Sequence, residues 1–388
     1  MVPELSSAFL RNTCLESSLK FDNTSQLPSL EGIIGQQRAV SSLEFGLGIE
    51  YKGFNIYAAG AVGTGKTTAI TSFVENRAKQ KPTPSDWCYV QNFYDPANPK
   101  ALSLPTGKGR EFQDSVLRLF EESTRSIKKS LESEEYQKQV QDLTTIYQEQ
   151  REKFLLSLSK QAQSKGFLIQ TNASSLKLIP HTNGNPMTES ELDNLTPKDR
   201  QKLNANHSML EKTLKDVIDQ IRSSERFFIQ GIQDIDTEIA NFALDFLVNE
   251  LKGKYSYSIE VASYLDEVQK DIVNNISSFK GDLQENSQSN PGKGNSNPLQ
   301  LSRRYSVNVI VEHQETDGAP VIMEANPSPR NLLGHVEKET HMGSLSTDFT
   351  MIRAGSLHRA NGGFLIIRIE EIINNKLAWE ALKRCLKE

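Results

Sequence analysis

The chain has 388 residues, a formal net charge of −5 at pH 7 and an isoelectric point near 5.8. It is longer than one hydrophobic core usually serves, so we expect two or three subdomains. The acidic balance gives no general attraction to nucleic-acid phosphates or anionic lipids. Nucleic acid is therefore not an expected partner.

The sequence carries no membrane or secretion signal. No window holds about 18 consecutive apolar residues, and the N-terminus MVPELSSAFLRNT lacks the basic and then apolar pattern of a signal peptide. The three cysteines, Cys14, Cys88 and Cys385, have neither CxxC nor Cys/His spacing, which favours reduced thiols over disulfides or zinc. We therefore expect a cytoplasmic protein without a membrane segment.

Residues 27–109, which follow an N-terminal segment of residues 1–26, alternate apolar runs with turn signals. The runs are LEGIIGQQRAVSSLEFGLGI, FNIYAAG and WCYVQNFYDPANP. Such alternation is typical of α/β folds. We expect the first part of an α/β core here.

The texture changes at Arg110, where a long polar helix is expected. Its apolar residues recur at spacings of 4, 3, 4 and 7, at Tyr136, Val140, Leu143, Tyr147 and Phe154. A second stripe has apolar residues at Leu210, Leu214, Val217, Ile221, Phe228, Ile235 and Ile239. Two such stripes predict an antiparallel helical coiled-coil arm over 110–280. Between them, GFLIQTNASSLKLIPHTNGNPM has a turn signal at Asn183-Gly184 and predicts a small β-hairpin tip over 166–188.

The alternation of apolar runs and turn signals that is typical of α/β folds resumes after a segment poor in apolar residues. That segment, GDLQENSQSNPGKGNSNPLQ, predicts a flexible loop over 281–302, and residues 303–388 are expected to form the second part of the core. A hairpin is predicted next, in which a strand turns at Asp317-Gly318 and a second strand returns. Its apolar residues are Val307, Val309, Val311, Val321 and Met323.

The motif GAVGTGKT, from Gly60 to Thr67, satisfies G-x-x-x-x-G-K-[ST] and lies between a strand-like run with Phe54, Ile56 and Tyr57 and a helix-like run. The glycines let the backbone N–H groups face a phosphate, and the helix N-terminus adds its positive dipole end. Lys66 would neutralise phosphate oxygens, and the Thr67 hydroxyl would take a Mg²⁺ position. The motif predicts ATP and Mg²⁺ as ligands of Gly60, Ala61, Val62, Gly63, Thr64, Gly65, Lys66 and Thr67.

A second nucleotide strand is expected within GGFLIIRIEE, residues 362–371, at the apolar run Phe364–Ile367. In P-loop ATPases the next position holds the acid that anchors Mg²⁺, whereas this chain has Arg368. On a continuing strand Glu370 would share the face of Arg368, and Glu371 would lie opposite. Glu370 is therefore the candidate substitute metal ligand, although a displacement of about 6.6 Å puts hydrolysis in question.

Together these pieces resemble the ATPase portion of Lon-like ATP-dependent proteases, in which a long helical insertion separates the two nucleotide strands. The resemblance rests on LEGIIGQQRAVSSLEFGLGI, GFNIYAAGAVGTGKT, DWCYVQNFYDPANPKALSLPTGKG, RYSVNVIVEHQETDGAPVI, NLLGHVEKE and TDFTMIRAGSLHRANGGFLII. It implies a P-loop AAA+ core, with a parallel sheet and flanking helices, interrupted by the arm. It also implies that Gly60–Thr68 bind ATP, that Ile34 lies over the adenine, and that Asn331–Glu339 faces the pore of a hexamer.

The same resemblance implies a function. The complete form would be a homo-oligomeric ring that couples ATP to the unfolding and delivery of protein substrates for proteolysis by a serine and lysine dyad. This chain ends at LAWEALKRCLKE, in the helix after the second strand, so we expect neither the peptidase domain nor its catalytic residues here. Candidate phosphate sensors are Arg330, Arg353 and Arg359.

Two other interpretations stay open. Arg368 also fits a protein that binds nucleotide without hydrolysing it, or a degenerate AAA+ protein. A DNA-associated P-loop ATPase with a coiled-coil arm would have an LSGGQ-like signature, whereas this chain has GSLHRANGG. Residues 110–165 also contain ten basic and ten acidic residues, so the arm has no basic stripe for phosphates.

Overall fold

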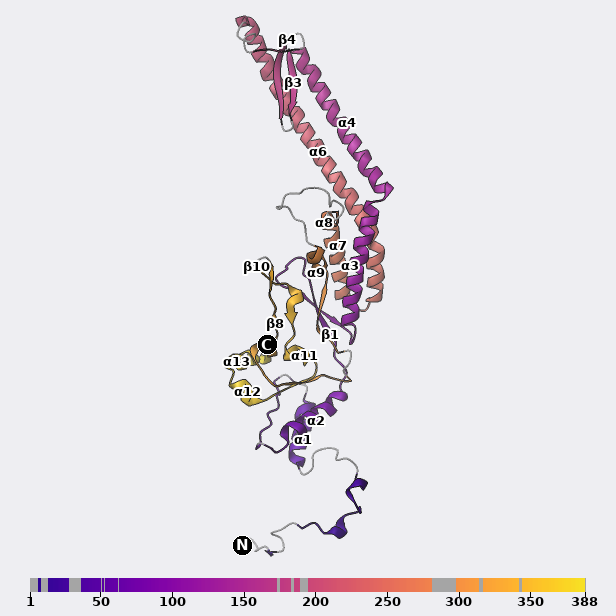
Figure 1. The fold of residues 1–388 in the computed structure, drawn as a ribbon, viewed down its shortest axis with the longest axis vertical. Coiled ribbons are helices and arrows are strands. Elements are labelled where there is room, and N and C mark those ends of the chain that lie inside the picture. The colour runs from indigo at the N-terminus through magenta and orange to yellow at the C-terminus, as the bar shows by residue number, and fades with distance from the viewer. Residues whose placement is uncertain are drawn as a thin grey trace. The chain divides into compact units, whose positions relative to one another are not determined.

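The computed structural model describes residues 6–7, 13–27, 36–49, 51, 53–61, 63–172, 175–182, 185–188, 195–280, 298–313, 317–341 and 344–387. The fold is mixed α/β and mostly helical (Figure 1). The chain forms two compact units. Within the described ranges, no helix combines the length and apolar character needed to cross a bilayer.

Unit 1 comprises Met1–Pro84, His313–His335 and Arg353–Glu388. Its elements are the 3-10 turns η2 (Glu16–Ser18) and η3 (Thr24–Gln26), helices α1 (Gln37–Gly48), α2 (Lys66–Lys79), α10 (Pro329–Leu333), α11 (Ser356–Arg359), α12 (Ile369–Ile373) and α13 (Lys376–Lys387), and strands β7 (Val321–Glu324) and β12 (Phe364–Ile367). The short paired strands β8 (His335–Val336) and β11 (Ile352–Arg353) span the points where the chain passes between units.

The centre of unit 1 is a parallel pair of strands. β7 and β12 run side by side from Val321 opposite Phe364 to Glu324 opposite Ile367. One face packs on a small core in which Leu332, Ile372 and Ala378 are buried, joined by the partly buried residues Leu333, Leu357, Leu365, Ile367, Ile369, Trp379 and Leu382. Gly363 is required before β12, because a Cβ there would lie 2.0 Å from the carbonyl oxygen of Pro320.

The strand expected before the phosphate loop is not formed. Residues 54–61 have no strand hydrogen bonding, and Phe54, Ile56 and Tyr57 are exposed. A strand requires a neighbour that accepts its backbone hydrogen bonds, and the apolar run does not indicate which neighbour that is. The described part of unit 1 therefore contains a two-stranded parallel sheet, and the larger parallel sheet expected from the sequence is not confirmed.

Unit 2 comprises Ser85–Glu312 and Val336–Ile352. Its helices are α3 (Gly109–Leu131), α4 (Glu134–Ser164), α6 (Pro197–Lys254), α7 (Ile259–Asn274), α8 (Ile276–Lys280), α9 (Pro298–Arg304) and the 3-10 turn η5 (Phe349–Met351). Its strands are β1 (Asp86–Val90), β2 (Lys100–Leu104), β3 (Phe167–Asn172), β4 (Ser175–Thr182), β5 (Asn185–Pro186), β6 (Val307–Val311), β9 (Glu339–His341) and β10 (Ser344–Ser346).

The predicted hairpin through Asp317-Gly318 is wrong. β6 pairs antiparallel with β1 in a sheet of order β2-β1-β6, whereas β7 pairs parallel with β12. Asp317-Gly318 is a bend between β6 and β7, and Gly318 has φ of 91°. The alternating pattern shows that a segment has a buried face but not which strand it joins.

The main core of unit 2 lies between the β2-β1-β6 sheet and the helices α3, α6, α7 and α8. Phe112 of α3 packs edge-on against Tyr255, with ring centroids 5.1 Å apart, and Phe120 stacks on Tyr305 at 5.3 Å. The carboxylate of Asp86, fully buried at the start of β1, accepts a 2.8 Å hydrogen bond from the N–H of Gly109. This contact ties the first strand to the first residue of α3.

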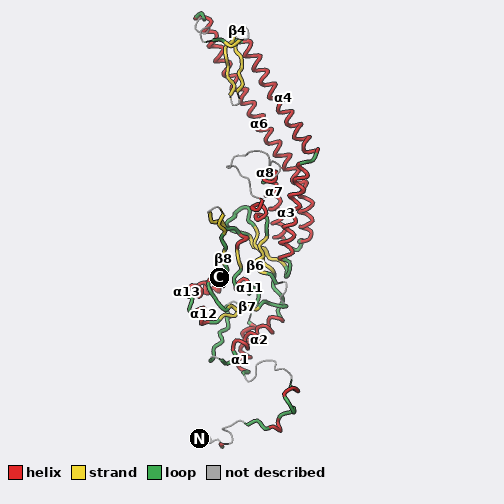
Figure 2. Tube along the Cα trace, viewed as in Figure 1, coloured by secondary structure: helices red, strands yellow, loops and turns green. Residues whose placement is uncertain are grey.

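The arm consists of α4 and α6, which run antiparallel and side by side (Figure 1). Tyr136 meets Asp236 near the base, Tyr147 stacks on Phe228 at 5.0 Å further along, and Lys165 contacts Met209 near the far end. The two apolar stripes therefore face each other. The β3–β4 hairpin lies between the far ends of these helices (Figure 2). The Asn183-Gly184 turn lies outside the described residues.

Two helix starts were missed by the sequence patterns. The helix expected from Arg110 is interrupted at Glu132 and Ser133, and the Ser133 hydroxyl accepts a hydrogen bond from Tyr136 N–H to cap α4. Residues 298–302, expected within a flexible loop, belong to α9. The rest of that loop, 281–297, lies outside the described residues.

The three thiols should react differently. Burial, with added repulsion from Asp86 and Glu312, raises the pKa of Cys88 to about 12, whereas Cys14 and Cys385 are exposed. We expect two thiols to react with a disulfide reagent at pH 8 and the third to react only in denaturant, since the thiolate is the nucleophile. Mass mapping of the modified peptides identifies the protected thiol, and rapid modification of native Cys88 would contradict this prediction.

Gly363→Ala should destabilise unit 1 by about 3 kcal/mol, because the new methyl group would overlap the backbone of Pro320. Gly48→Ala is the matched control, since a Cβ there meets nothing within 4 Å. The measurement is urea unfolding in a Trp87→Phe background, where Trp379 is the remaining tryptophan and reports unit 1. Equal midpoints for the two variants would disprove the steric argument.

Candidate nucleotide site

The phosphate-loop motif forms a curved backbone that leads directly into helix α2. Gly63 and Gly65 have φ of 82° and 74°, in the left-handed region that glycine tolerates best. Gly65 is the N-cap of α2, and no side chain caps the first-turn N–H groups of the helix. Those N–H groups and the positive end of the helix dipole suit an oxyanion.

Lys66 folds back over this loop. Its ammonium donates hydrogen bonds to the carbonyl oxygens of Gly60 and Ala61, the latter at 3.0 Å. Thr64 also donates to the carbonyl oxygen of Ala61, at 2.9 Å. These three hydrogen bonds close the loop around the place where a phosphate group would be held. The residues present therefore fit the phosphates of a nucleotide, with Lys66 as the cation that would exchange carbonyl oxygens for phosphate oxygens.

The remaining predicted nucleotide residues divide into two groups. Thr67 and Thr68 are exposed in the first turn of α2, so the Thr67 hydroxyl is accessible to a hydrated Mg²⁺. Ile34 and Val62 lie outside the described residues. Within the described ranges, no group of three or more His, Cys, Asp and Glu side chains forms a metal site on its own. This is compatible with Mg²⁺ that arrives with nucleotide and is held largely by phosphates and water.

Helix α2 is fixed to the parallel strands at its C-terminal end. The N–H of Ala319 donates to the carbonyl oxygen of Ala78 at 2.9 Å, and the ammonium of Lys81 lies 5.5 Å from the ring centroid of Phe364. The end of α2 is therefore held at the amino ends of β7 and β12. A helix whose C-terminus lies at the amino ends of parallel strands has its N-terminus toward the carboxyl ends of those strands. Open α/β sheets bind their ligands at the carboxyl ends of the strands.

The expected continuation of the second strand past residue 368 is wrong. β12 ends at Ile367, and exposed Arg368 is the N-cap residue of α12. Glu370 and Glu371 lie in the first turn of that helix, where carboxylates interact favourably with its positive end. The strand alternation used to favour Glu370 therefore does not apply, because the chain turns into a helix there. A metal role for Glu370 stays a prediction.

The sequence patterns missed a buried carboxylate at the carboxyl end of β7. Glu324 accepts hydrogen bonds from the Ser356 hydroxyl and from Asn326 N–H at 2.9 Å. Arg359 reaches the same pair, with Nη2 3.2 Å from Ser356 Oγ and 3.7 Å from a Glu324 carboxylate oxygen. The sequence feature that could have indicated it is the acidic residue directly after the apolar run VIM, at the expected carboxyl end of a strand.

This network gives Arg359 a structural partner. Glu324 is opposite Ile367 in the parallel register, on the face that packs against α10 and α13. Its carboxylate accepts two hydrogen bonds and forms an ion pair with Arg359, so it holds α11 against β7. The candidate pore segment from Asn331 to Glu339 is divided among α10, β8 and β9.

Comparisons with known protein families agree with this geometry. Residues 317–388 match the model of a LonB-like AAA domain, which defines the class of the segment that holds both parallel strands. Residues 86–119 match the model of a Lon-like LonC helical domain, which covers β1, β2 and the start of α3. Both matches support membership of the Lon-like protease family. A comparison with curated proteins gave no match.

Lys66→Ala should weaken ATP binding at least tenfold (~1.4 kcal/mol), because the ammonium is the main positive charge of the loop. Lys79→Ala removes an exposed lysine from the other end of the same helix and should bind as the wild type does. Titration of a fluorescent ATP analogue followed by anisotropy measures both. Unchanged affinity in Lys66→Ala would exclude the loop as the phosphate site.

Proposed function

We propose that this chain is the ATP-binding AAA+ portion of a Lon-like ATP-dependent protease. In this proposal the loop from Gly60 to Thr68 binds ATP with Mg²⁺, and the complete protein assembles as a homo-oligomeric ring. Nucleotide binding is coupled to unfolding and delivery of protein substrates for proteolysis. The observation that carries the proposal is the phosphate loop at the start of α2, in a chain that also has Lon-like AAA and helical segments.

A second function is favoured by the residue at the end of β12. Arg368 places a cation where ATPases of this class have the Mg²⁺-anchoring carboxylate, and the nearby acids lie in α12. A protein with this arrangement would hold nucleotide and turn it over slowly. Nucleotide would then stabilise the ring or its contacts, as a structural ligand. The two functions share ATP binding and differ in turnover.

Arg368→Asp should raise Mg²⁺-dependent ATP turnover at least tenfold, because it supplies a carboxylate at the end of β12 and removes a cation that repels Mg²⁺. Arg384→Asp, at an exposed position of α13, makes the same charge change elsewhere and should leave turnover unchanged. Phosphate release with and without Mg²⁺ is the measurement. Rapid turnover by the wild type that Arg368→Asp abolishes would mean that Arg368 takes part in catalysis and would exclude the nucleotide-holding function.

A further inference from the structure

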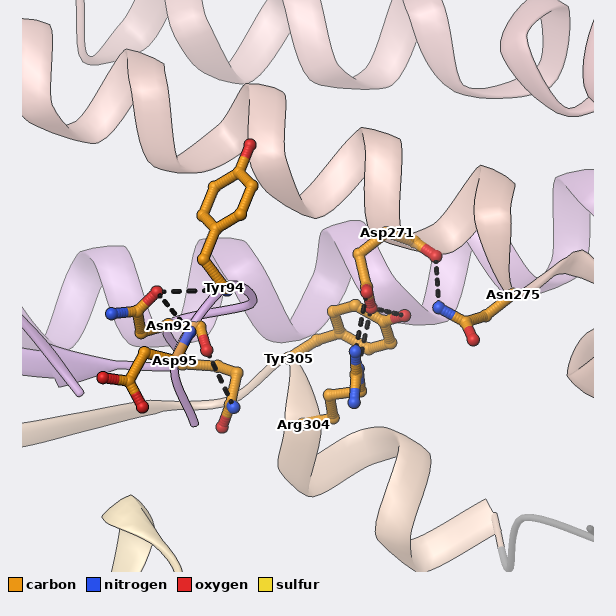
Figure 3. Close-up of polar contacts among 8 residues, drawn as sticks. Asn92, Tyr94, Asp95, Asp271, Asn275, Arg304 and Tyr305 are labelled. Atoms are coloured by element: carbon orange, nitrogen blue, oxygen red, sulfur yellow. Dashed lines mark hydrogen bonds and ion pairs between the residues drawn. The ribbon is translucent and has the colours of Figure 1, made fainter. Parts of the chain in front are cut away.

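The loop that follows β1 is held in one conformation by its own side chains. The Asn92 amide oxygen accepts hydrogen bonds from the N–H groups of Tyr94 and Asp95, both at 3.2 Å, and its Nδ2 donates to Asn98 O at 2.9 Å (Figure 3). Asp95 in turn accepts hydrogen bonds from Asn98 Nδ2 at 2.7 Å and from Ala97 N–H at 3.3 Å. Such Asx turns replace the backbone ladder that a loop lacks.

The loop is also anchored in the core through Phe93. The Phe93 ring stacks on Tyr264 at 6.2 Å and lies 6.0 Å from the ring of Tyr305. The guanidinium of Arg304 covers the same ring at 5.5 Å. Arg304 is fixed by Asp271, whose carboxylate accepts its Nε and Nη2 at 2.7 and 2.6 Å and the Tyr305 hydroxyl at 2.8 Å (Figure 3). The base of the loop cannot move without breaking this cluster.

The neighbouring residue, Tyr94, has the opposite environment. Its side chain is 78% exposed, although the residues on both sides of it are fixed. An aromatic ring held on a preorganised loop loses little entropy on binding, which is typical of the residues that dominate protein interfaces. Phe242 and Phe246, whose rings are also exposed, lie on helix α6.

The two basic side chains nearest this loop are paired with acids of unit 2. Lys100, whose ammonium lies 5.8 Å from the Tyr94 ring centroid, is bound to both carboxylate oxygens of Glu267 at 2.6 and 2.7 Å. Arg304 is paired with Asp271. Both acids belong to α7. Both nearby cations are therefore compensated, so the Tyr94 ring suits an apolar side chain better than a phosphate.

We propose that Tyr94 is a contact residue for apolar side chains of unfolded polypeptides. Unfolded chains expose the aromatic and aliphatic side chains that folded proteins bury, so one exposed ring can bind many of them weakly. A tyrosine buries about 150–250 Å², whereas a stable dimer interface needs about 1,200–2,000 Å², so this loop alone suits a transient polypeptide contact better than a second copy. The substrate class rests on the proposed function, but the contact uses no residue of the nucleotide site.

The test uses a permanently unfolded probe, fluorescein-labelled, reduced and carboxymethylated α-lactalbumin, titrated with the full chain and followed by anisotropy. Tyr94→Ala should weaken binding about tenfold, and Asn92→Ala should weaken it because the loop loses its preorganisation. Tyr94→Phe keeps the ring and should bind within twofold of the wild type. Phe242→Ala, which removes a ring that is 83% exposed on α6, is the matched control and should also stay within twofold.

Several results would overturn the proposal. These are full affinity in Tyr94→Ala, equal affinity for native α-lactalbumin, or no binding of the unfolded probe by the wild type. A fall in oligomeric mass of Tyr94→Ala by light scattering would also overturn it, since the ring would then contact a second copy. A measurement of ATP binding by the same proteins separates the two proposals. Tyr94→Ala should bind ATP as the wild type does, whether or not it binds the probe. Failure of the wild type to bind ATP would count only against the proposed function.

Discussion

The antiparallel ladder between β1 and β6 is the constraint on which unit 2 depends. It pairs Val90 with Val307 and Trp87 with Val311, so it joins segments more than two hundred residues apart. Everything between them, including the arm, is thereby closed into a loop with fixed ends. Closing such a loop costs entropy that grows only slowly with length, so a long insertion is tolerated once the ladder and its core exist. The ladder, with α3, α6 and α7 packed on it, supports the base of the arm, whose far end has a small buried cluster of Ala162, Phe167 and Leu210.

Local patterns predicted the parts of the fold that depend on one periodicity. The stripes through Tyr147 and Phe228 predicted paired helices because each stripe needs an apolar partner, and the two rings stack in the structure. The glycines of the motif predicted a loop that turns its N–H groups toward a phosphate before a helix, and Gly63 and Gly65 have the left-handed backbone that few other residues adopt. These features depend on residues that lie close together in the sequence.

Features that depend on a distant partner could not be predicted. The run after Tyr305 has the alternation of a strand, but its partner is β1 and not the segment after Gly318. Glu324 carries no motif, and its importance appears only when Ser356 and Arg359 are brought to it. Glu370 was favoured by continuing a strand that in fact ends at Ile367. In each case tertiary packing decided the outcome and the local pattern did not.

The two proposed sites lie in different units and are prepared in different ways. The Tyr94 loop is preorganised by side-chain hydrogen bonds and by the packed ring of Phe93. The phosphate loop instead has uncapped N–H groups, and Lys66 donates a hydrogen bond to the carbonyl oxygen of Ala61. Nucleotide should therefore stabilise unit 1 more than it stabilises unit 2. A ligand present at 100 times its Kd adds about 2.7 kcal/mol to the free energy of unfolding of whatever folds with it. Trp87 lies in unit 2 and Trp379 in unit 1, so two variants that each retain one tryptophan can report the stability gain of each unit. A gain confined to Trp379 would mean that nucleotide acts on unit 1 alone, and a gain at both would measure the coupling between ATP and the unit that carries the arm.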